Sequence, residues 1–218
     1  MTHTTDTVLV IILLSVLLSL GSSRLKALVE TMALQGIMVS LVPILLDYGA
    51  DGHVGGSLIF VQIMIVIKGV LIPGLLFTAA RRMTIKREIE PIIGYHASLL
   101  AGLIMIMVST LVTQRMHLTL PVGREMLLTT AITTLAAGLF LMMSRRKAIT
   151  QVIGYLMLEN GIYLVGTALT KQSHTLYVIE FGVLLDLLVG VMIMGIILNN
   201  INHAFDDVDT TYLGSLKD

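Results

Sequence analysis

Three ionisable residues, Lys68, Glu159 and Asp186, stand about halfway along long apolar segments. An ionisable side chain at the centre of a membrane helix costs roughly 2.5–3.5 kcal/mol on insertion scales, so each of the three needs a partner or a use. Burial disfavours the charged form of an acid or an amine, and a neighbouring opposite charge favours it. Groups held between these two influences can exchange protons when water or a partner moves. The three residues therefore meet the physical requirements of a proton relay.

Other polar residues accompany these three at the same depth or on the same helix face. Tyr155, Glu159 and Tyr163 recur at every fourth position, so they share one face and can form hydrogen bonds along it. Gln35 occupies the comparable level of an earlier segment. The candidate relay residues are Lys68, Glu159, Asp186, Glu180, Tyr155, Tyr163 and Gln35.

Pro73 follows Lys68 in the same apolar segment. A proline has no backbone N–H, and its ring crowds the carbonyl four residues earlier, which here belongs to Gly69. A free backbone acceptor next to Lys68 and a local kink or bulge in the helix are expected.

Several of these residues also have a plainer explanation. A buried lysine with two carboxylates can be a static ion pair that only fixes the register of the helices. Glu180 lies nearer the outer surface of the membrane. Solvation of its carboxylate at the interface explains its presence there as well as a role on the proton path does. His96 could shuttle protons, but a lone histidine near a helix end is more often only hydrogen-bonded. We assign no metal site and no catalytic residue, because metal-ligand spacing and a nucleophile constellation are both missing.

The composition is that of a membrane protein, with 56% hydrophobic residues, 13% charged residues and a mean hydropathy of +0.92. The sequence has no cysteine, so the chain holds no disulfide and no cysteine-ligated iron–sulfur cluster. A formal net charge of zero gives no reason to expect a nucleic-acid partner.

Seven segments are long and apolar enough to cross a bilayer, which takes about 20 residues. Charged residues, Gly and Pro occupy the stretches between these segments. Such residues are unfavourable in the hydrocarbon core of a bilayer, so they mark the loops. Asp6 rather than Lys or Arg precedes the first apolar run, so we expect a retained helix rather than a signal peptide. The fold class is therefore all-α and polytopic. The spans are predicted at residues 5–22, 25–47, 56–80, 92–113, 125–143, 147–169 and 176–199.

Lys and Arg residues are unevenly divided between the two sides of these spans. One side carries the basic residues of the loops at 24–26, 81–87 and 145–147, and Lys217 of the tail. The other side has only Arg115, Arg124 and Lys171. By the positive-inside rule the first side is cytoplasmic, which predicts an N-terminus outside and a C-terminus inside.

We divide the chain into three N-terminal spans at 1–90, a connecting span and loop at 91–120, a three-helix module at 121–199 and an acidic cytoplasmic tail at 200–218. The segment that starts at Ser57 aligns without a gap to the segment that starts at Thr175. This alignment places Gln62 on Glu180 and Lys68 on Asp186. Because apolar sequences match by chance easily, both an internal duplication and a chance match remain open.

The segment SRRKAITQVIGYLMLENGIYLVG, the acid-bearing span after it and the acidic tail together resemble the K subunit of respiratory complex I. The hydrogenase-4 component E family carries this module behind extra N-terminal helices. The chain is similar to that family over nearly its whole length, including VIKGVLIPGLLFTAARR and GYLMLENG. Asp186 falls where the K subunits have their second intramembrane acid. Leu156 stands at the position of the first acid, and Glu159 lies one helical turn away from it.

The resemblance implies a membrane-arm subunit of a complex I-like, energy-converting hydrogenase of the hydrogenase-4 or formate hydrogenlyase type, in the inner (cytoplasmic) membrane. Such a subunit couples proton or sodium movement to electron transfer in a hydrophilic arm. It would hold no cofactor itself, and the NiFe centre and iron–sulfur clusters would lie in partner subunits. Expected partners are the lipid bilayer, antiporter-like and complex I H-subunit-like membrane subunits, and hydrophilic hydrogenase subunits. A subunit of a multisubunit cation/proton antiporter and a non-conducting scaffold are the alternatives.

Overall fold

The computed structural model describes residues 2–47, 55–82, 92–116, 124–145, 147–169, 182, 185–186 and 188–195. Every element in these ranges is a helix, so the expected all-α class is confirmed for them. The elements are α1 (Thr2–Gly21), α2 (Leu25–Asp47), α3 (Gly55–Val66), the π-helical segment η1 (Ile67–Leu71), α4 (Ile72–Arg82), α5 (Tyr95–Arg115), α6 (Glu125–Ser144) and α7 (Ala148–Leu169).

Six helices within the described ranges are long and apolar enough to cross a membrane: α1, α2, the continuous α3–η1–α4 unit, α5, α6 and α7. They coincide with six of the seven predicted spans to within a few residues at each end. The chain is therefore a multi-pass membrane protein. The seventh predicted span, 176–199, lies largely outside the described residues, and those described within it, 182, 185–186 and 188–195, are helical. The count of seven and the membrane orientation stay predictions.

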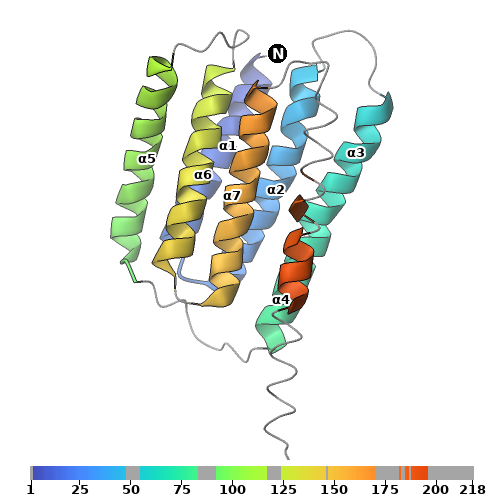
Figure 1. The fold of residues 1–218 in the computed structure, drawn as a ribbon, viewed down its shortest axis with the longest axis vertical. Helices are drawn as coiled ribbons and strands as arrows, with labels where there is room; N and C mark the ends of the chain where they lie inside the picture. Colours follow the sequence, from blue (N-terminus) through green and yellow to red (C-terminus); the bar gives the residue numbers. More distant parts are fainter. Residues whose placement is uncertain are drawn as a thin grey trace, which may run out of the picture.

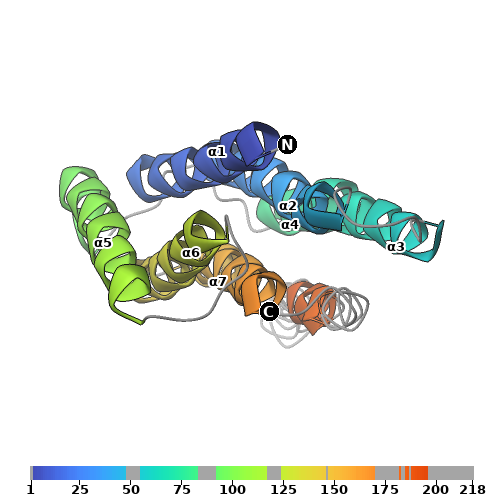
Figure 2. The same cartoon turned by 90° about the horizontal axis from the view of Figure 1, so that it is seen from above.

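The helices run up and down in two facing rows. Figure 2 shows α1, α2 and the α3–α4 unit in one row, α6, α7 and residues 188–195 in the other, and α5 beside α1 and α6. The ends of α1, α4 and α6 and the starts of α2, α5 and α7 meet at the lower end in Figure 1. We call this the basic end, because Arg24, Lys26, Arg145 and Lys147 lie there.

Two buried arginines join helix ends across the bundle. The Arg145 guanidinium donates hydrogen bonds to the carbonyl oxygens of Leu20 at 3.3 Å and Ser22 at 3.4 Å, and lies 5.2 Å from the Tyr95 ring centroid. Arg124 donates to the carbonyl oxygen of Thr167 at 3.4 Å. The last carbonyls of a helix have no partner within the helix and carry partial negative charge, so these cations stabilise the ends of α1 and α7.

The interior is layered along the bundle axis. The basic-side cluster of buried apolar residues contains Val16, Leu20, Leu28, Val29, Met32, Ile72, Leu76, Ala79, Ala137, Leu141, Ile149, Val152, Ile153, Leu156, Met157, Val189 and Ile193. The opposite-side cluster contains Leu9, Ile12, Val39, Val42, Val61, Met64, Leu127, Leu128, Ala131, Tyr163, Leu164 and Ala168. Between the two clusters, α2, η1, α7 and the helical residues 185–186 place five buried polar residues at a similar level. These residues are Gln35, Lys68, Glu159, Asn160 and Asp186.

The closest helix packing is between α6 and α7, where glycines face the backbone of the other helix. A Cβ atom added to Gly161 would lie 2.5 Å from the backbone nitrogen of Leu135, and one added to Gly138 would collide with the backbone of Leu158. Small residues let membrane helices approach closely enough for van der Waals contact and interhelical bonding. The close approach holds α7, and with it Glu159, in a fixed position.

Replacing Gly161 by alanine should lower the free energy of unfolding by about 1–3 kcal/mol, because the backbone of α6 must move to admit the methyl group. Thermal unfolding of the detergent-solubilised protein measures this loss. Gly74→Ala is the matched control, because a Cβ atom added there meets nothing within 4 Å. Equal melting temperatures for the two variants would contradict the packing argument.

Candidate ion-pair site in the bundle interior

Lys68 lies in the π-helical segment η1. The N–H of Ile72 donates to the carbonyl of Ile67, five residues back rather than four. The wider turn admits the Pro73 ring, which would otherwise press on a carbonyl of the preceding turn. The predicted bulge next to Lys68 is therefore confirmed.

Two glycines bring α2 close to η1. A Cβ atom added to Gly36 would lie 2.8 Å from the Cβ of Lys68, and one added to Gly69 would lie 2.9 Å from the Ile37 side chain. Without side chains at these two positions, the backbone of η1 packs directly on α2. The stem of Lys68 passes α2 at Gly36, and its ammonium group reaches α7.

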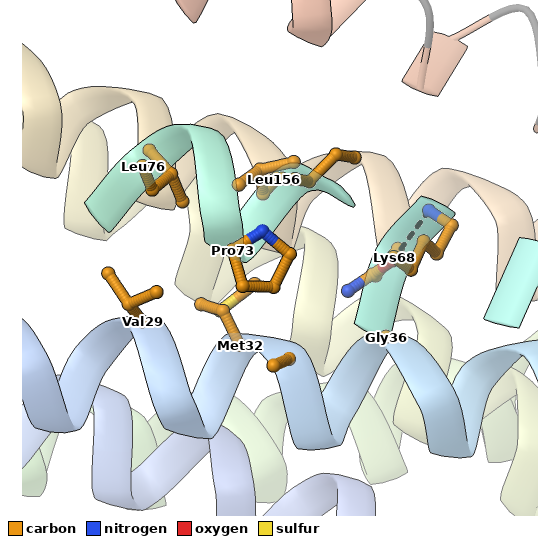
Figure 3. Close-up of a pocket in the computed structure, with 10 residues that line it drawn as sticks. Val29, Met32, Gly36, Lys68, Pro73, Leu76 and Leu156 are labelled. Carbon is orange, nitrogen blue, oxygen red and sulfur yellow. Dashed lines mark hydrogen bonds between the residues drawn. The ribbon is translucent and has the colours of Figure 1, made fainter. Parts of the chain in front are cut away.

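The ammonium group of Lys68 meets three oxygen atoms. Its Nζ lies 2.7 Å from Oε1 of Glu159 and 2.9 Å from Oδ1 of Asp186. It also donates a hydrogen bond of 3.0 Å to Oδ1 of Asn160, drawn as a dashed line from Lys68 in Figure 3. The contacts with Glu159 and Asn160 are hydrogen bonds, and the contact with Asp186 is an ion pair. We call Lys68, Glu159, Asn160 and Asp186 the lysine cluster.

The lysine cluster is buried, with Lys68 5% exposed, Asn160 3% exposed and both acids 1% exposed. With both acids ionised, it holds one positive and two negative charges. Oε2 of Glu159 and both carboxylate oxygens of Asp186 have no hydrogen-bond partner among the described residues. Because an unbalanced buried charge is costly, one added proton on either acid would bring the cluster to neutrality. The cluster can thus take up and release one proton.

Of the seven candidate relay residues, the structure brings Lys68, Glu159 and Asp186 into direct contact. Gln35 and Tyr163 are buried at nearby levels, but the Gln35 amide and the Tyr163 hydroxyl have no hydrogen-bond partner among the described residues. Tyr163 lies close enough to Asp186 to interact with it electrostatically.

Of the two further candidates, one interacts electrostatically with Glu159 and the other lies outside the described residues. Tyr155 is half-buried and packs against the basic-side cluster. Glu180 lies outside the residues that the structure describes.

Asn160 belongs to the cluster but is missing from the candidates proposed on sequence grounds. The sequence does not single it out, because two carboxylates carry four oxygen atoms and could by themselves accept all three hydrogen bonds of a buried ammonium. Neighbouring residues on a helix point about 100° apart, so both Glu159 and Asn160 can reach one ammonium only when it lies between their directions.

Comparisons with known proteins find distant relatives by sequence. No protein-family model matches the chain, and no solved structure matches it. The chain is 28% identical over 196 residues to the uncharacterized protein Rv0085 of Mycobacterium tuberculosis, covering 89% of this chain and 87% of that protein. It is 25% identical over 150 residues to hydrogenase-4 component E of Escherichia coli K12, covering 69% of this chain and 68% of that protein. The chain is thus a distant homologue of hydrogenase-4 component E.

Proposed function

We propose that this chain is a membrane subunit of a complex I-like, energy-converting hydrogenase, in which the lysine cluster relays protons or sodium ions. The distant homology to hydrogenase-4 component E supports membership of a hydrogenase assembly. The multi-pass fold supports a place in its membrane arm. Because the chain has no cysteine, the NiFe centre and iron–sulfur clusters belong to partner subunits in this proposal.

The observation that carries the ion-moving role is the second acid of the lysine cluster. A static ion pair needs one carboxylate for one ammonium, and a further buried carboxylate adds cost without adding balance. Here Glu159 and Asp186 both lie within 3 Å of the Lys68 nitrogen. An excess acid at mid-depth is what a group that binds and releases a cation requires. This excess favours a relay over a structural pair.

The proposal also assigns the surroundings of the subunit. Antiporter-like and complex I H-subunit-like membrane subunits would receive or supply the ion, and the hydrophilic hydrogenase subunits would carry the electrons. The basic end faces the cytoplasm in this assignment, because basic loops stay on that side of the inner membrane. Residues 121–199 would then correspond to a K-subunit-like module.

Purification through an affinity tag on this chain, from the native membrane in mild detergent, tests the assignment. We expect a nickel–iron hydrogenase large subunit, iron–sulfur proteins and antiporter-like subunits to co-purify, as identified by mass spectrometry. A preparation from cells without the tag is the control for adventitious binding. Recovery of antiporter subunits alone, or of this chain alone, would reject membership of a hydrogenase.

A further inference from the structure

A pocket adjoins the lysine cluster between α2, α4 and α7 (Figure 3). Lys68 and Asn160 line its inner end, and Met32, Ala33, Val29 and Leu76 continue it toward the basic end. Val29 lies one turn from the start of α2, and Leu76 lies one turn into α4. The pocket therefore extends from the middle of the bundle toward the basic loops.

The pocket is large enough for water. The space open to the centre of a water molecule is about 10 Å³, which is room for about one water. A Cβ atom at position 36 would press on the stem of Lys68, so Gly36 keeps this part of the wall open. Apolar walls bind water weakly, and hydrophobic constrictions of this kind open and close by wetting and drying.

The other side of the cluster has a different cover. One helical turn beyond the cluster, toward the opposite end, stand Val39 of α2, Met64 of α3 and Tyr163 of α7. Val39 and Met64 are 0% exposed, and Tyr163 is 2% exposed. All three belong to the opposite-side cluster. The apolar residues toward the basic end are equally buried, with Val29 0% and Leu76 1% exposed. What distinguishes the basic side is the pocket that these residues line.

We propose that this pocket is the entrance through which water, carrying protons, reaches the lysine cluster from the basic end. Lys68 donates hydrogen bonds to Glu159 and Asn160 and forms an ion pair with Asp186. A proton that arrives from outside these contacts needs a further hydrogen-bonding group. Water in the pocket is such a group, because the pocket reaches Lys68 and Asn160 directly. The access of water to the cluster is inferred from the pocket alone. The use of the delivered proton for ion movement rests on the proposed function.

The absence of cysteine allows a direct test in the full-length chain in membrane vesicles. Single cysteines at Ala33 or Met32 place one thiol in the pocket, and Val39→Cys places one about two turns from Met32 on the same face of α2. Only a hydrated thiol ionises, so a membrane-impermeant methanethiosulfonate reagent should label Ala33→Cys and Met32→Cys on the order of tenfold faster than Val39→Cys.

Two further variants define the side and the medium. Lys26→Cys marks the basic end, because Lys26 is exposed there. Leu14→Cys marks lipid, because Leu14 is an apolar residue with 53% of its surface exposed. Ala33→Cys and Met32→Cys should react from the side that labels Lys26→Cys. Leu156 also lines the pocket, so the thiol of Leu156→Cys should react as well. Adding Ala33→Phe to this variant fills the pocket and should slow the reaction.

Three results would overturn the proposal: pocket thiols that react no faster than Val39→Cys, pocket thiols labelled only from the side opposite to Lys26→Cys, or pocket thiols that behave like Leu14→Cys and so face an acyl chain. The labelling needs no hydrogenase activity. It therefore stands or fails separately from the co-purification that tests the proposed function.

Discussion

Replacing Lys68 by Met, Glu159 by Gln and Asp186 by Asn together should abolish proton movement while assembly and hydrogen turnover continue. The three replacements keep side-chain volume nearly unchanged and remove every charge from the lysine cluster. Exchanging a whole buried ion pair for neutral residues is often harmless to stability. A relay, in contrast, loses each group that can bind the proton. Acidification of everted vesicles, followed with a pH-sensitive dye beside hydrogenase turnover, measures both properties in one preparation.

The exposed ion pair Lys26–Glu30 provides the matched control for this variant. Its Nζ–Oε1 distance is 3.7 Å, and its side chains are 77% and 58% exposed. Lys26→Met with Glu30→Gln should change neither turnover nor proton movement. Undiminished proton movement in the triple variant would reject the relay and leave a static ion pair. Joint loss of assembly, turnover and proton movement would instead support the scaffold alternative.

The level of the lysine cluster could be predicted from the sequence because the bilayer fixes the length and direction of each span. Lys68, Glu159 and Asp186 each lie about midway between the charged ends of their segments, so counting residues is enough to place them at one depth. The bulge at Pro73 could be predicted for a local reason, since the ring and a carbonyl of the preceding turn belong to the same helix.

Rotation about the helix axes could not be predicted in the same way. Four residues advance a helix by about 40° beyond a full turn, so Tyr155, Glu159 and Tyr163 fan out across α7 instead of forming one narrow line. Tyr155 is accordingly only half-buried, while Tyr163 is buried. The contact of Asn160 with Lys68 could not be predicted either, because it depends on how α7 is rotated about its axis relative to η1. Gln35 is buried near the predicted depth, and its amide has no hydrogen-bond partner among the described residues.

Replacing Lys68 alone by Met should have a much larger effect on stability than replacing all three residues. Removing one partner of a buried ion pair leaves uncompensated charge and typically costs about 3–5 kcal/mol. In the Lys68→Met variant, Glu159 and Asp186 remain buried without the ammonium that binds both. We expect a large drop in the melting temperature of the detergent-solubilised protein, or little folded protein by size-exclusion chromatography.

The control is Lys26→Met, which breaks an exposed pair and should cost about 0–1 kcal/mol. Adding Glu159→Gln and Asp186→Asn to Lys68→Met should restore most of the lost stability, because each neutral amide removes one unpaired charge. The three positions are in contact, so their effects should not add, and the size of the recovery measures the coupling among them. A Lys68→Met variant as stable as Lys26→Met would mean that the acids do not need the ammonium for stability, and the charge balance assigned to the cluster would be wrong.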